Sequence, residues 1–311
     1  MSGFPFTPDP RLTGLVIAHR NAALIADRVL PRLGMPVPTR QFRYLKFDFS
    51  QGITIPDTKV GRKGTPNQVE FYATEVADQV EDYGLSDVIP NDDVTNAPTG
   101  YDPRDFAATK LIELVDLDRE VRVANVVFDA ATYPSGNKET LSGTSQWDDP
   151  DSTPIEDVQD AMDAMIMRPN KLVLGRPVWT RLRRHPKIIA AISTSGTESG
   201  VATLTAVADL LEIPEIVVGD AWVNTAKKGQ TVTRTRAWGK HAALLHVPAS
   251  LSSTTDGTPA FGYTAVYGTR VSGETPAKVG LRGGVEITSG ESVAEVIASS
   301  ELGHLFTNAV S

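Results

Sequence analysis

Three carboxylates stand close together at Asp148, Asp149 and Asp151, in the stretch SGTSQWDDPDSTPIEDV. Such a group of oxygens could bind a divalent cation, and a metal-assisted hydrolase using Asp148, Asp149 and Asp151 is the enzyme that this spacing suggests. A calcium loop, however, alternates its oxygens around a glycine, whereas here proline interrupts the run and no glycine follows. The same residues fit the start of a helix, with Asp151 or Ser152 as the cap and Pro154 in the first turn. The sequence therefore favours helix capping over a metal site.

Other catalytic or cofactor-binding patterns are absent from the sequence. The chain has no cysteine, which excludes disulfides, thiolate catalysis and cysteine-bound zinc, and its five histidines lack helical i, i+4 pairing. Glycine-rich phosphate-binding motifs and the G-x-S-x-G nucleophile motif do not occur. Only carboxylates brought together from distant parts of the chain could still form a site. We therefore expect no enzymatic activity, catalytic residue, cofactor or bound metal.

Composition points to an acidic globular protein. The 311 residues are 41% hydrophobic, enough for a sizeable core in one large domain or two medium ones. Thirty Lys and Arg against 38 Asp and Glu give a formal net charge of -8, which argues against a surface built to bind phosphate tightly. The N-terminal residues do not fit a signal sequence, and no stretch approaches the roughly 20 apolar residues of a membrane span. We expect no contact with a membrane.

The densest group of cations is RLRRHPK, which includes Arg181, Arg183 and Arg184. It lies on and just after a segment of helical spacing and lacks interleaved aromatic residues, so a solvated helix face is favoured over nucleic-acid binding. A contact with an acidic subunit is the other open interpretation. Trp147, which follows the stretch SGTSQ, is expected to be a packing anchor and not a platform for a substrate.

Two alternating segments, 42–48 and 67–76, predict β-strands that are separated by a long connection. The connection, SQGITIPDTKVGRKGTP, is rich in glycine and proline and carries the cations Lys59, Arg62 and Lys63, so it cannot build a core of its own. Compact domains rarely carry long unstructured connections unless these bind something. We therefore expect a β-hairpin loop that projects from the body and contacts a partner subunit.

The longest helix is expected at about 102–123, with Asp102 as its cap and Pro103 in its first turn. Its apolar spacing predicts one buried face, and its charged positions predict a face that meets water or another subunit. The residues expected to be buried are Phe106, Leu111, Leu114, Val115, Leu117 and Val121. The charged residues expected on the other face are Arg104, Asp105, Lys110, Glu113, Asp118 and Arg119.

Around this helix, segments with helix and strand patterns alternate along the chain. An extended arm is expected at 1–10 and one helix from 12 to 30, ending at Pro31. Further helices are expected at 155–165, 176–189 and 202–213, a loop at 193–200, and strands at 171–175, 214–225, 241–249, 262–273 and 283–298. This mixture predicts an α+β or α/β fold.

The segment WDDPDSTPIEDV, which begins at Trp147, and the segment PNKLVLGRPVWTRLRRHPKI at 169–188 together resemble the central signature of tailed-phage major capsid proteins with the Hong Kong 97-type fold. In many of these proteins a tryptophan and an aspartate-proline stretch precede a helix, an apolar strand and a helix that ends near H-P. The order of arm, projecting loop and long helix is also similar. The resemblance implies an α+β fold with an N-terminal arm, an extended β-hairpin loop, a long spine helix, and peripheral and axial domains.

The resemblance also implies how the chain is divided and what it does. The expected parts are an N-terminal arm and helix at 1–41, an extended hairpin loop at 42–76, a peripheral domain with the spine helix at 77–170, an axial domain at 171–265 and a return to the peripheral domain at 266–311. The subunits would assemble with themselves, in the host cytoplasm, into hexamers and pentamers of an icosahedral virion shell around loosely and non-specifically contacted double-stranded DNA. A separate scaffold, a portal and decoration proteins are the implied partners. An encapsulin-like protein compartment, which shares the fold, is the alternative.

The residues expected to take part in assembly are Lys59, Arg62, Lys63, Trp147, Arg181, Arg183 and Arg184. Some family members cross-link through a loop lysine, and Lys59 and Lys63 lie in the corresponding loop. Some members also carry an N-terminal scaffolding region of coiled-coil character. This chain begins too close to its first helix to contain one, so we expect either a cleaved region or a separate scaffold.

Overall fold

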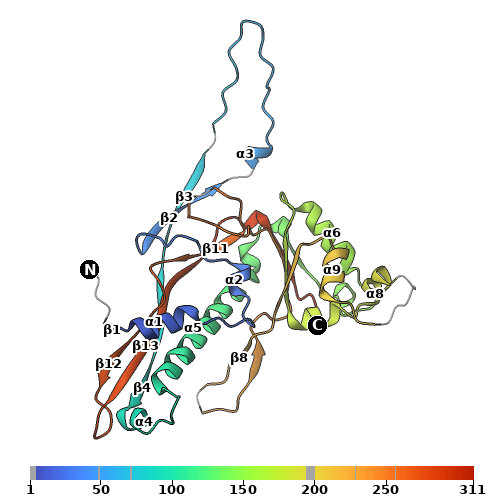
Figure 1. Ribbon diagram of the computed structural model, residues 1–311. Coiled ribbons are helices and arrows are strands. Elements are labelled where there is room, and N and C mark those ends of the chain that lie inside the picture. Colours follow the sequence, from blue (N-terminus) through green and yellow to red (C-terminus); the bar gives the residue numbers. More distant parts are fainter. Residues whose placement is uncertain (1–4, 48–49, 71, 194–199, 228, 256) are drawn as a thin grey trace.

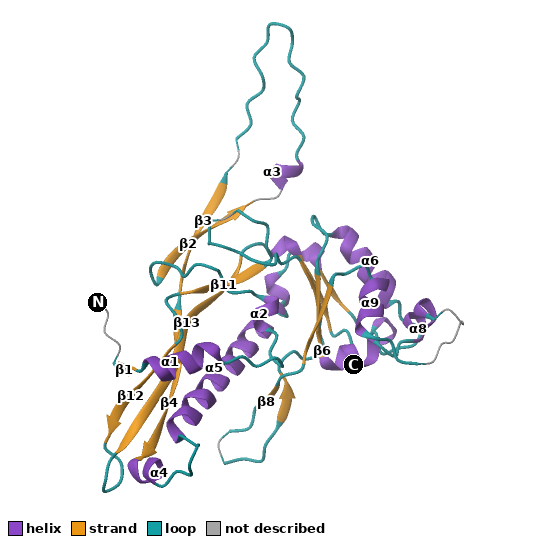
Figure 2. Ribbon diagram, viewed as in Figure 1, coloured by secondary structure: helices purple, strands orange, loops and turns teal. Residues whose placement is uncertain are grey.

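The computed structural model describes residues 5–47, 50–70, 72–193, 200–227, 229–255 and 257–311. Two five-stranded sheets and the helices packed on them form the body, and a long loop extends from it (Figures 1 and 2). The combination of helices with largely antiparallel sheets confirms the α+β class. None of the helices in these ranges has both the length and the apolar character needed to cross a membrane.

The first sheet is built around the 14-residue strand β13 (Gly284–Ile297). One part of β13 pairs with β12 (Val271–Ala277) and another with β11 (Gly262–Val266), while β4 (Glu81–Pro90) pairs with ten of its residues. The short strand β1 (Thr7–Pro8) pairs with β12. All of these pairs are antiparallel, so the first sheet joins segments from both ends of the chain.

Helix α5 (Pro103–Val127) lies along this sheet, against β4 and β13. Asp102 caps the helix by accepting a hydrogen bond from the backbone N–H of Arg104, and Pro103 is its first residue, as predicted. The buried face differs from the prediction, because small alanines face the sheet while Phe106 and Leu114 are 51% and 53% exposed. The buried residues are Ala107, Ala108, Leu111, Ile112, Val115, Arg119, Glu120, Val123, Ala124 and Val127.

Two short helices, α1 (Pro10–Ala18) and α2 (Ala26–Val29), replace the single helix predicted between residues 12 and 30. The chain turns at Asn21, whose side-chain oxygen and carbonyl oxygen accept hydrogen bonds from the amides two and three residues further on. Such local bonds compete with a helix. The carboxylate of Glu120 then accepts hydrogen bonds from the amides at the start of α2. The prediction of one continuous helix was therefore wrong.

The second sheet carries four helices on one face (Figure 1). Its strand order is β5 (Lys138–Thr140), β14 (Gly303–Thr307), β10 (Ala242–Leu245), β6 (Lys171–Gly175) and β7 (Glu215–Gly219). The covering helices are α6 (Pro154–Ala164), α7 (Arg176–Leu182), α8 (Pro186–Ile192) and α9 (Leu204–Leu210). Side chains on the opposite face of the sheet pack against α2 and the last turns of α5, which joins the two sheets into one body.

Shorter elements complete the fold. β2 (Gln41–Phe47) and β3 (Ala73–Gln79) form an antiparallel ribbon at the base of the projecting loop, and β8 (Trp222–Asn224) pairs with β9 (Arg234–Arg236) in a second ribbon. Two further short helices are α3 (Ser50–Ile53) and α4 (Asn91–Thr95). The 3-10 helices are η1 (Ala130–Thr132), η2 (Ser135–Asn137), η3 (Gly143–Ser145) and η4 (Ser300–Leu302).

Several predicted elements are divided or displaced. The helix expected at 176–189 is two helices, α7 and α8, because the chain leaves the helical path at His185 and Pro186 begins a new helix. The strands expected at 214–225 and 262–273 are each divided in two, and the strand expected at 67–76 begins at Ala73. The sequence analysis did not predict β4, β5, β9 or β14. Residues 1–4 of the predicted arm and most of the predicted loop at 193–200 lie outside the described residues.

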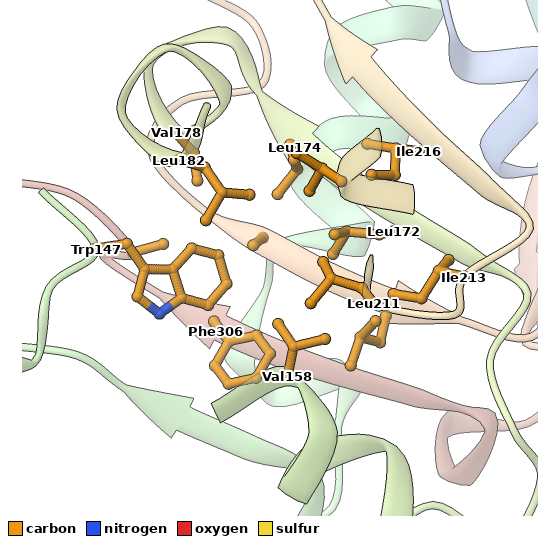
Figure 3. Packing of buried hydrophobic residues seen from close by; sticks show 14 of the residues in the cluster. Trp147, Val158, Leu172, Leu174, Val178, Leu182, Leu211, Ile213, Ile216 and Phe306 are labelled. Atoms are coloured by element: carbon orange, nitrogen blue, oxygen red, sulfur yellow. The ribbon is translucent and has the colours of Figure 1, made fainter. Parts of the chain in front are cut away.

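Trp147 is fully buried in the core between the second sheet and its helices (Figure 3). The centroid of its ring lies 5.2 Å from that of Phe306, and its Nε1 donates a hydrogen bond to Oδ2 of Asp157 over 2.8 Å. The ring therefore fills the core and also fixes the first turn of α6. These contacts confirm the prediction of a packing anchor, and they leave no part of the ring for direct contact with another subunit.

His304 is a buried titratable group in the same layer. Its ring lies 4.8 Å from that of Phe306, and among the described residues neither ring nitrogen has a hydrogen-bond partner. Burial lowers the pKa of His304 to about 4, because apolar surroundings disfavour the charged imidazolium.

We expect Trp147→Ala to lower the free energy of unfolding of the subunit by about 3 to 5 kcal/mol, because it removes a fully buried indole and leaves a cavity. Trp147→Phe is the matched control, since it keeps an aromatic ring but cannot bond to Asp157, and it should cost less. Chemical denaturation of unassembled subunits measures both changes. An alanine variant as stable as the parent would contradict the packing role.

The buried His304 should make the subunit sensitive to acid. The unfolded chain takes up a proton near pH 6.5, whereas the folded chain does so only near pH 4. The stabilising effect of the neutral ring is therefore complete above pH 6.5 and is lost as the pH falls towards 4, by up to about 3 kcal/mol. His304→Leu should remove this part of the pH dependence. Unfolding of parent and variant between pH 7 and pH 4 tests this, and parallel curves would contradict it.

Candidate functional site

The three carboxylates after Trp147 do not form a metal site, and two of them have hydrogen-bond partners of their own. The Asp148 carboxylate accepts hydrogen bonds from the backbone N–H and Oγ of Ser311, over 3.2 and 2.6 Å, and these bonds lower its pKa. Asp149 Oδ1 accepts a hydrogen bond from the backbone N–H of Asp151. No group of three or more His, Cys, Asp or Glu side chains with metal-binding geometry occurs in the described part of the chain. The hydrolase hypothesis therefore lacks its site.

The acids also do not cap α6. The cap residue is Thr153, its side chain makes no capping bond to the helix amides, and Pro154 is the first helical residue. Ser152 is buried, and its Oγ donates a hydrogen bond to the carbonyl of Asp149 and lies 3.1 Å from Nε2 of His185. The prediction of a helix start was correct, but the prediction that Asp151 or Ser152 is the cap was wrong. Both residues precede the cap Thr153, and they donate hydrogen bonds to Asp149 in the turn before the helix.

The connection between β2 and β3 projects far from the body (Figure 2). Apart from α3, the described residues of this connection form no helix or strand, and nearly all of their side chains are exposed. Lys59, Arg62 and Lys63 lie together in the outer part of this loop, and none of them makes an ion pair with any residue that the structure describes. Ile53 and Ile55 are 64% and 90% exposed. The described part of the loop therefore carries cations without ion-pair partners and uncovered apolar side chains.

The base of the loop is fixed to the body. In β2, Phe42 and Tyr44 are buried in a cluster with residues of the first sheet, and the Tyr44 and Tyr263 rings meet edge to face with centroids 6.5 Å apart. Further out, the side chain of Gln51 forms hydrogen bonds with both the amide and the carbonyl of Tyr72. These bonds hold the outgoing and returning parts of the chain together beyond the ribbon. The projection therefore starts from a rigid base.

A buried cluster of charges surrounds α5. Arg119, only 2% exposed, donates hydrogen bonds to Asp27 Oδ1 over 2.6 Å and to Thr264 Oγ1 over 2.9 Å. Glu120, at 0% exposure, accepts hydrogen bonds from the first amides of α2 and from Nε1 of Trp238 over 2.6 Å. The prediction that Arg119 lies on the solvated face was therefore wrong. The signal in the sequence is its position four residues after the buried Val115, on the same stripe of the helix.

Ion pairs extend this cluster to the first sheet. Arg32 binds both carboxylate oxygens of Glu291, over 2.9 and 3.1 Å, and Arg270 binds Glu291 and Asp116. Burial raises the pKa of Glu120 in spite of its three donors. Burial also acts to raise the pKa of Glu291, but the ion pairs with Arg32 and Arg270 bring it below its usual value. The cluster therefore holds ionised Glu291 inside the protein by direct pairing.

A pocket of about 490 Å³ opens over this cluster, between the turn after α1 and α5. Its lining includes Asp27, Arg32, Asp116, Arg119 and Arg270. These five residues already pair with one another or with Glu291. Most of the charges that line the pocket therefore have their partners inside the subunit, and Arg20 is the lining cation that has no ion pair among the described residues.

The cations of RLRRHPK lie together near the end of α7. Arg181 and Arg184 are exposed and line a hollow of about 450 Å³, which Arg236 and Ser311 also line. Arg183 is half-buried, with its guanidinium 5.7 Å from the Trp179 ring centroid. The projecting loop points away from the layer that carries α7 and α8 (Figure 1). The residues expected to act in assembly therefore form two separate groups, and the buried Trp147 belongs to neither.

We expect Glu120→Ala to lower the free energy of unfolding by about 3 to 5 kcal/mol, because it leaves three buried donors, the amides of Ile25 and Ala26 and Nε1 of Trp238, without their acceptor. Glu113→Ala is the matched control on the same helix. Glu113 is partly exposed and pairs with Lys110, so its loss should cost less than about 1 kcal/mol. Denaturant unfolding of the two variants measures the difference, and equal losses would contradict the structural role of the buried cluster.

Sequence relatives cover the whole chain. The major capsid protein of Pseudomonas phage JBD67 is 46% identical over 311 residues, which is 100% of this chain and 99% of that protein. The major capsid protein of Burkholderia phage BcepMu is 27% identical over 277 residues, 82% of each chain. A family model described as phage major capsid protein E matches residues 128–260. The matched region includes Trp147 and the whole of α6, α7, α8 and α9.

Solved structures share the fold. The crystal structure of a phage-related protein from Bordetella bronchiseptica has a TM-score of 0.75 at 23% identity and covers 98% of both chains. The capsid of cyanophage P-SCSP1u has a TM-score of 0.58 at 12% identity over 93% of this chain and 89% of that one. An encapsulin of Synechococcus elongatus has a TM-score of 0.54 at 7% identity over 94% and 90%.

The full-length relationship at 46% identity and the shared architecture agree with the signature around Trp147. The chain therefore belongs to the phage major capsid proteins with the Hong Kong 97-type fold, the structural subunits of the phage shell.

Proposed function

We propose that copies of this chain form hexamers and pentamers, which close into an icosahedral shell around double-stranded DNA. The observation that carries the proposal is the 46% identity, along the entire chain, to a protein named as a major capsid protein. The net charge of -8 supports loose and non-specific contact with DNA, because an acidic inner surface does not hold phosphate tightly. Assembly in the host cytoplasm, with a separate scaffold, a portal and decoration proteins as partners, is part of the same proposal.

An encapsulin-like compartment has less support. Its basis is a fold likeness at 7% identity, which says nothing of contents, whereas the sequence relatives at 46% and 27% identity are both named as major capsid proteins. The content of the particle separates the two functions, since one encloses nucleic acid and the other a protein.

We propose that the subunit is divided into the parts that the family implies. These are the arm at 1–41, the loop at 42–76, a peripheral domain at 77–170 and 266–311, and an axial domain at 171–265. The first sheet with α5 supports the peripheral domain, and the second sheet with α7, α8 and α9 supports the axial one. Strand pairing favours moving β5 and β14, together with α6, into the axial domain, because β14 pairs with β10 and β5 pairs with β14.

The projecting loop is proposed to dock on a neighbouring subunit, with Lys59, Arg62 and Lys63 among its contacts. Two features support this. The loop has uncovered apolar side chains at Ile53 and Ile55, and its cations have no ion-pair partner among the described residues. Ordering such a segment costs conformational entropy that only contacts with a partner can offset.

Electron microscopy of the purified chain tests the proposed function. We expect closed, regular particles, and particles purified from infected or co-expressing cells should contain nuclease-protected double-stranded DNA. Small oligomers alone would contradict a shell protein, and protein-filled particles without nucleic acid would favour the compartment.

Limited trypsin digestion tests the docking of the loop. We expect cleavage after Lys59, Arg62 or Lys63 in unassembled subunits and protection of these bonds in particles, because the segment becomes covered. A variant with glutamine at all three positions is the control that assigns the fragment to the loop. Equal cleavage rates before and after assembly would count against docking.

A further inference from the structure

Helix α6 presents a stripe of carboxylates to the solvent. Glu156, Asp160 and Asp163 are spaced i, i+4 and i+7, so they share one face of the helix, and all three are exposed. None of them makes an ion pair with another residue that the structure describes. Like charges at this spacing destabilise an isolated helix. Within one subunit, this acid stripe of Glu156, Asp160 and Asp163 is therefore unfavourable.

The edge of the second sheet adds to the same acidic surface. Glu139, in the edge strand β5, is exposed, and its pKa is raised by partial burial and by the nearby carboxylates of Asp157 and Asp160. Glu139 therefore extends the acidic surface of α6 onto the edge of the sheet.

A matching set of cations lies on α7 and the start of α8. Arg181, Arg184 and Lys187 recur every three residues and are exposed, and no ion pair links them to any described residue. We call these three residues the cationic surface. Arg181 and Arg184 also line the hollow of about 450 Å³ beside Ser311. The cationic surface thus combines unpaired charge with a concave shape.

The two surfaces follow from a separation of charge along the chain. Every charged residue from 139 to 163 is acidic, and every one from 164 to 197 is basic. Other acids of the same layer are neutralised within the subunit, since Glu212 pairs with Arg168, Glu215 with Arg28, and Asp220 with Arg176 and Arg236. The acid stripe and the cationic surface therefore differ from these neutralised acids, because their charges have no ion-pair partner among the described residues.

The acid stripe and most of the cationic surface belong to different sides of the layer. α6 lies near η2, at the β5 edge of the sheet, while α7, which carries Arg181, follows β6 next to β7, the strand at the opposite edge. The start of α8 adjoins α6, and Nζ of Lys187 donates a hydrogen bond to the carbonyl of Asp151 over 2.7 Å, so the cationic surface extends from α7 back towards α6. In Figure 1 the C-terminus, which lines the hollow through Ser311, lies on the far side of this layer from α6. Two copies placed side by side can bring these surfaces together. A contact between two different surfaces, repeated around an axis, closes a ring.

We propose that the acid stripe of α6 docks onto the cationic surface of α7 and α8 in a second copy of this chain, as the side-by-side contact within a ring of subunits. The inference rests on the proposed function, because it assigns a contact within the rings proposed there. Three unpaired carboxylates match three unpaired cations in one sequence. DNA in the hollow would engage only the cations and would leave the acid stripe without a partner.

Charge reversal tests the contact. The acid-reversed variant carries E156K, D160K and D163K, and the cation-reversed variant carries R181E, R184E and K187E. In each variant alone, like charges face each other at every contact, and we expect rings and shells to form at least about tenfold less well than in the parent. The variant with all six changes restores opposite charges and keeps the net charge of -8. It should assemble, and it is the matched control for folding, because it contains every substitution of the two inactive variants.

Mixing the two single-surface variants gives a sharper result. Each can contact only the other, so subunits must alternate around the ring. An even ring of six closes with every contact matched, whereas a ring of five leaves one mismatched contact. Sedimentation and electron microscopy should therefore find hexamers in the mixture and few pentamers or closed shells.

The outcomes separate the docking from the proposed function. Particles from the parent and from both single-surface variants would overturn the docking alone, and so would failure of the six-change variant when circular dichroism shows it folded. A cation-reversed variant that assembles normally but loses affinity for double-stranded DNA in a gel shift would assign the hollow to nucleic acid and overturn the contact. Absence of particles from the parent chain would overturn the proposed function itself.

Discussion

The buried charges of Arg119 and Glu120 are the constraint on which the arrangement of the subunit depends. Consecutive helix residues point about 100° apart, so Arg119 reaches Thr264 in the first sheet while Glu120 reaches Trp238, which packs on the second. Burying these charges costs desolvation energy that apolar side chains would not cost. In return, a rotation or shift of α5 would leave both charges without partners. These bonds therefore fix the position of α5 relative to both sheets. Glu120 also fixes the start of α2 against α5, because it accepts hydrogen bonds from the first amides of α2.

The sequence predicts the elements whose signals are local. The start of α5 follows from Asp102 and Pro103, and the strand β6 from a short apolar run, LVL, that ends in glycine. Predictions fail where a distant partner decides the outcome. The N-terminal segment has helical spacing, but its amides bond to Glu120, 95 residues away, so the helix is interrupted. β4 contains too many acids to look like a strand, and it forms because β13 pairs with ten of its residues.

The candidate assembly surfaces could be predicted only in part from the sequence. The projecting loop could be predicted, because glycine, proline and cations between two strands exclude a core. The cations of RLRRHPK were also visible in the sequence, but the positions of α7 and α6 at different edges of the second sheet were not, since they depend on strand order. Acidic and basic side chains thus pair with each other in the interior around α5. On the surface of the second-sheet layer, acidic side chains gather on α6 and basic ones on α7 and the start of α8. Only the pairing is required for the subunit to fold.

The position of β13 in the chain has a consequence for synthesis. This strand is the centre of the first sheet, yet it is formed by residues 284–297, and its neighbours include residues 81–90. Contacts between segments so far apart in sequence form late and slowly. While the ribosome is still translating the middle of the chain, β4 and α5 have no sheet to pack on, and their apolar faces remain uncovered. The surfaces that recognise other copies are therefore completed only after the last strands emerge, which delays association until each polypeptide is nearly finished.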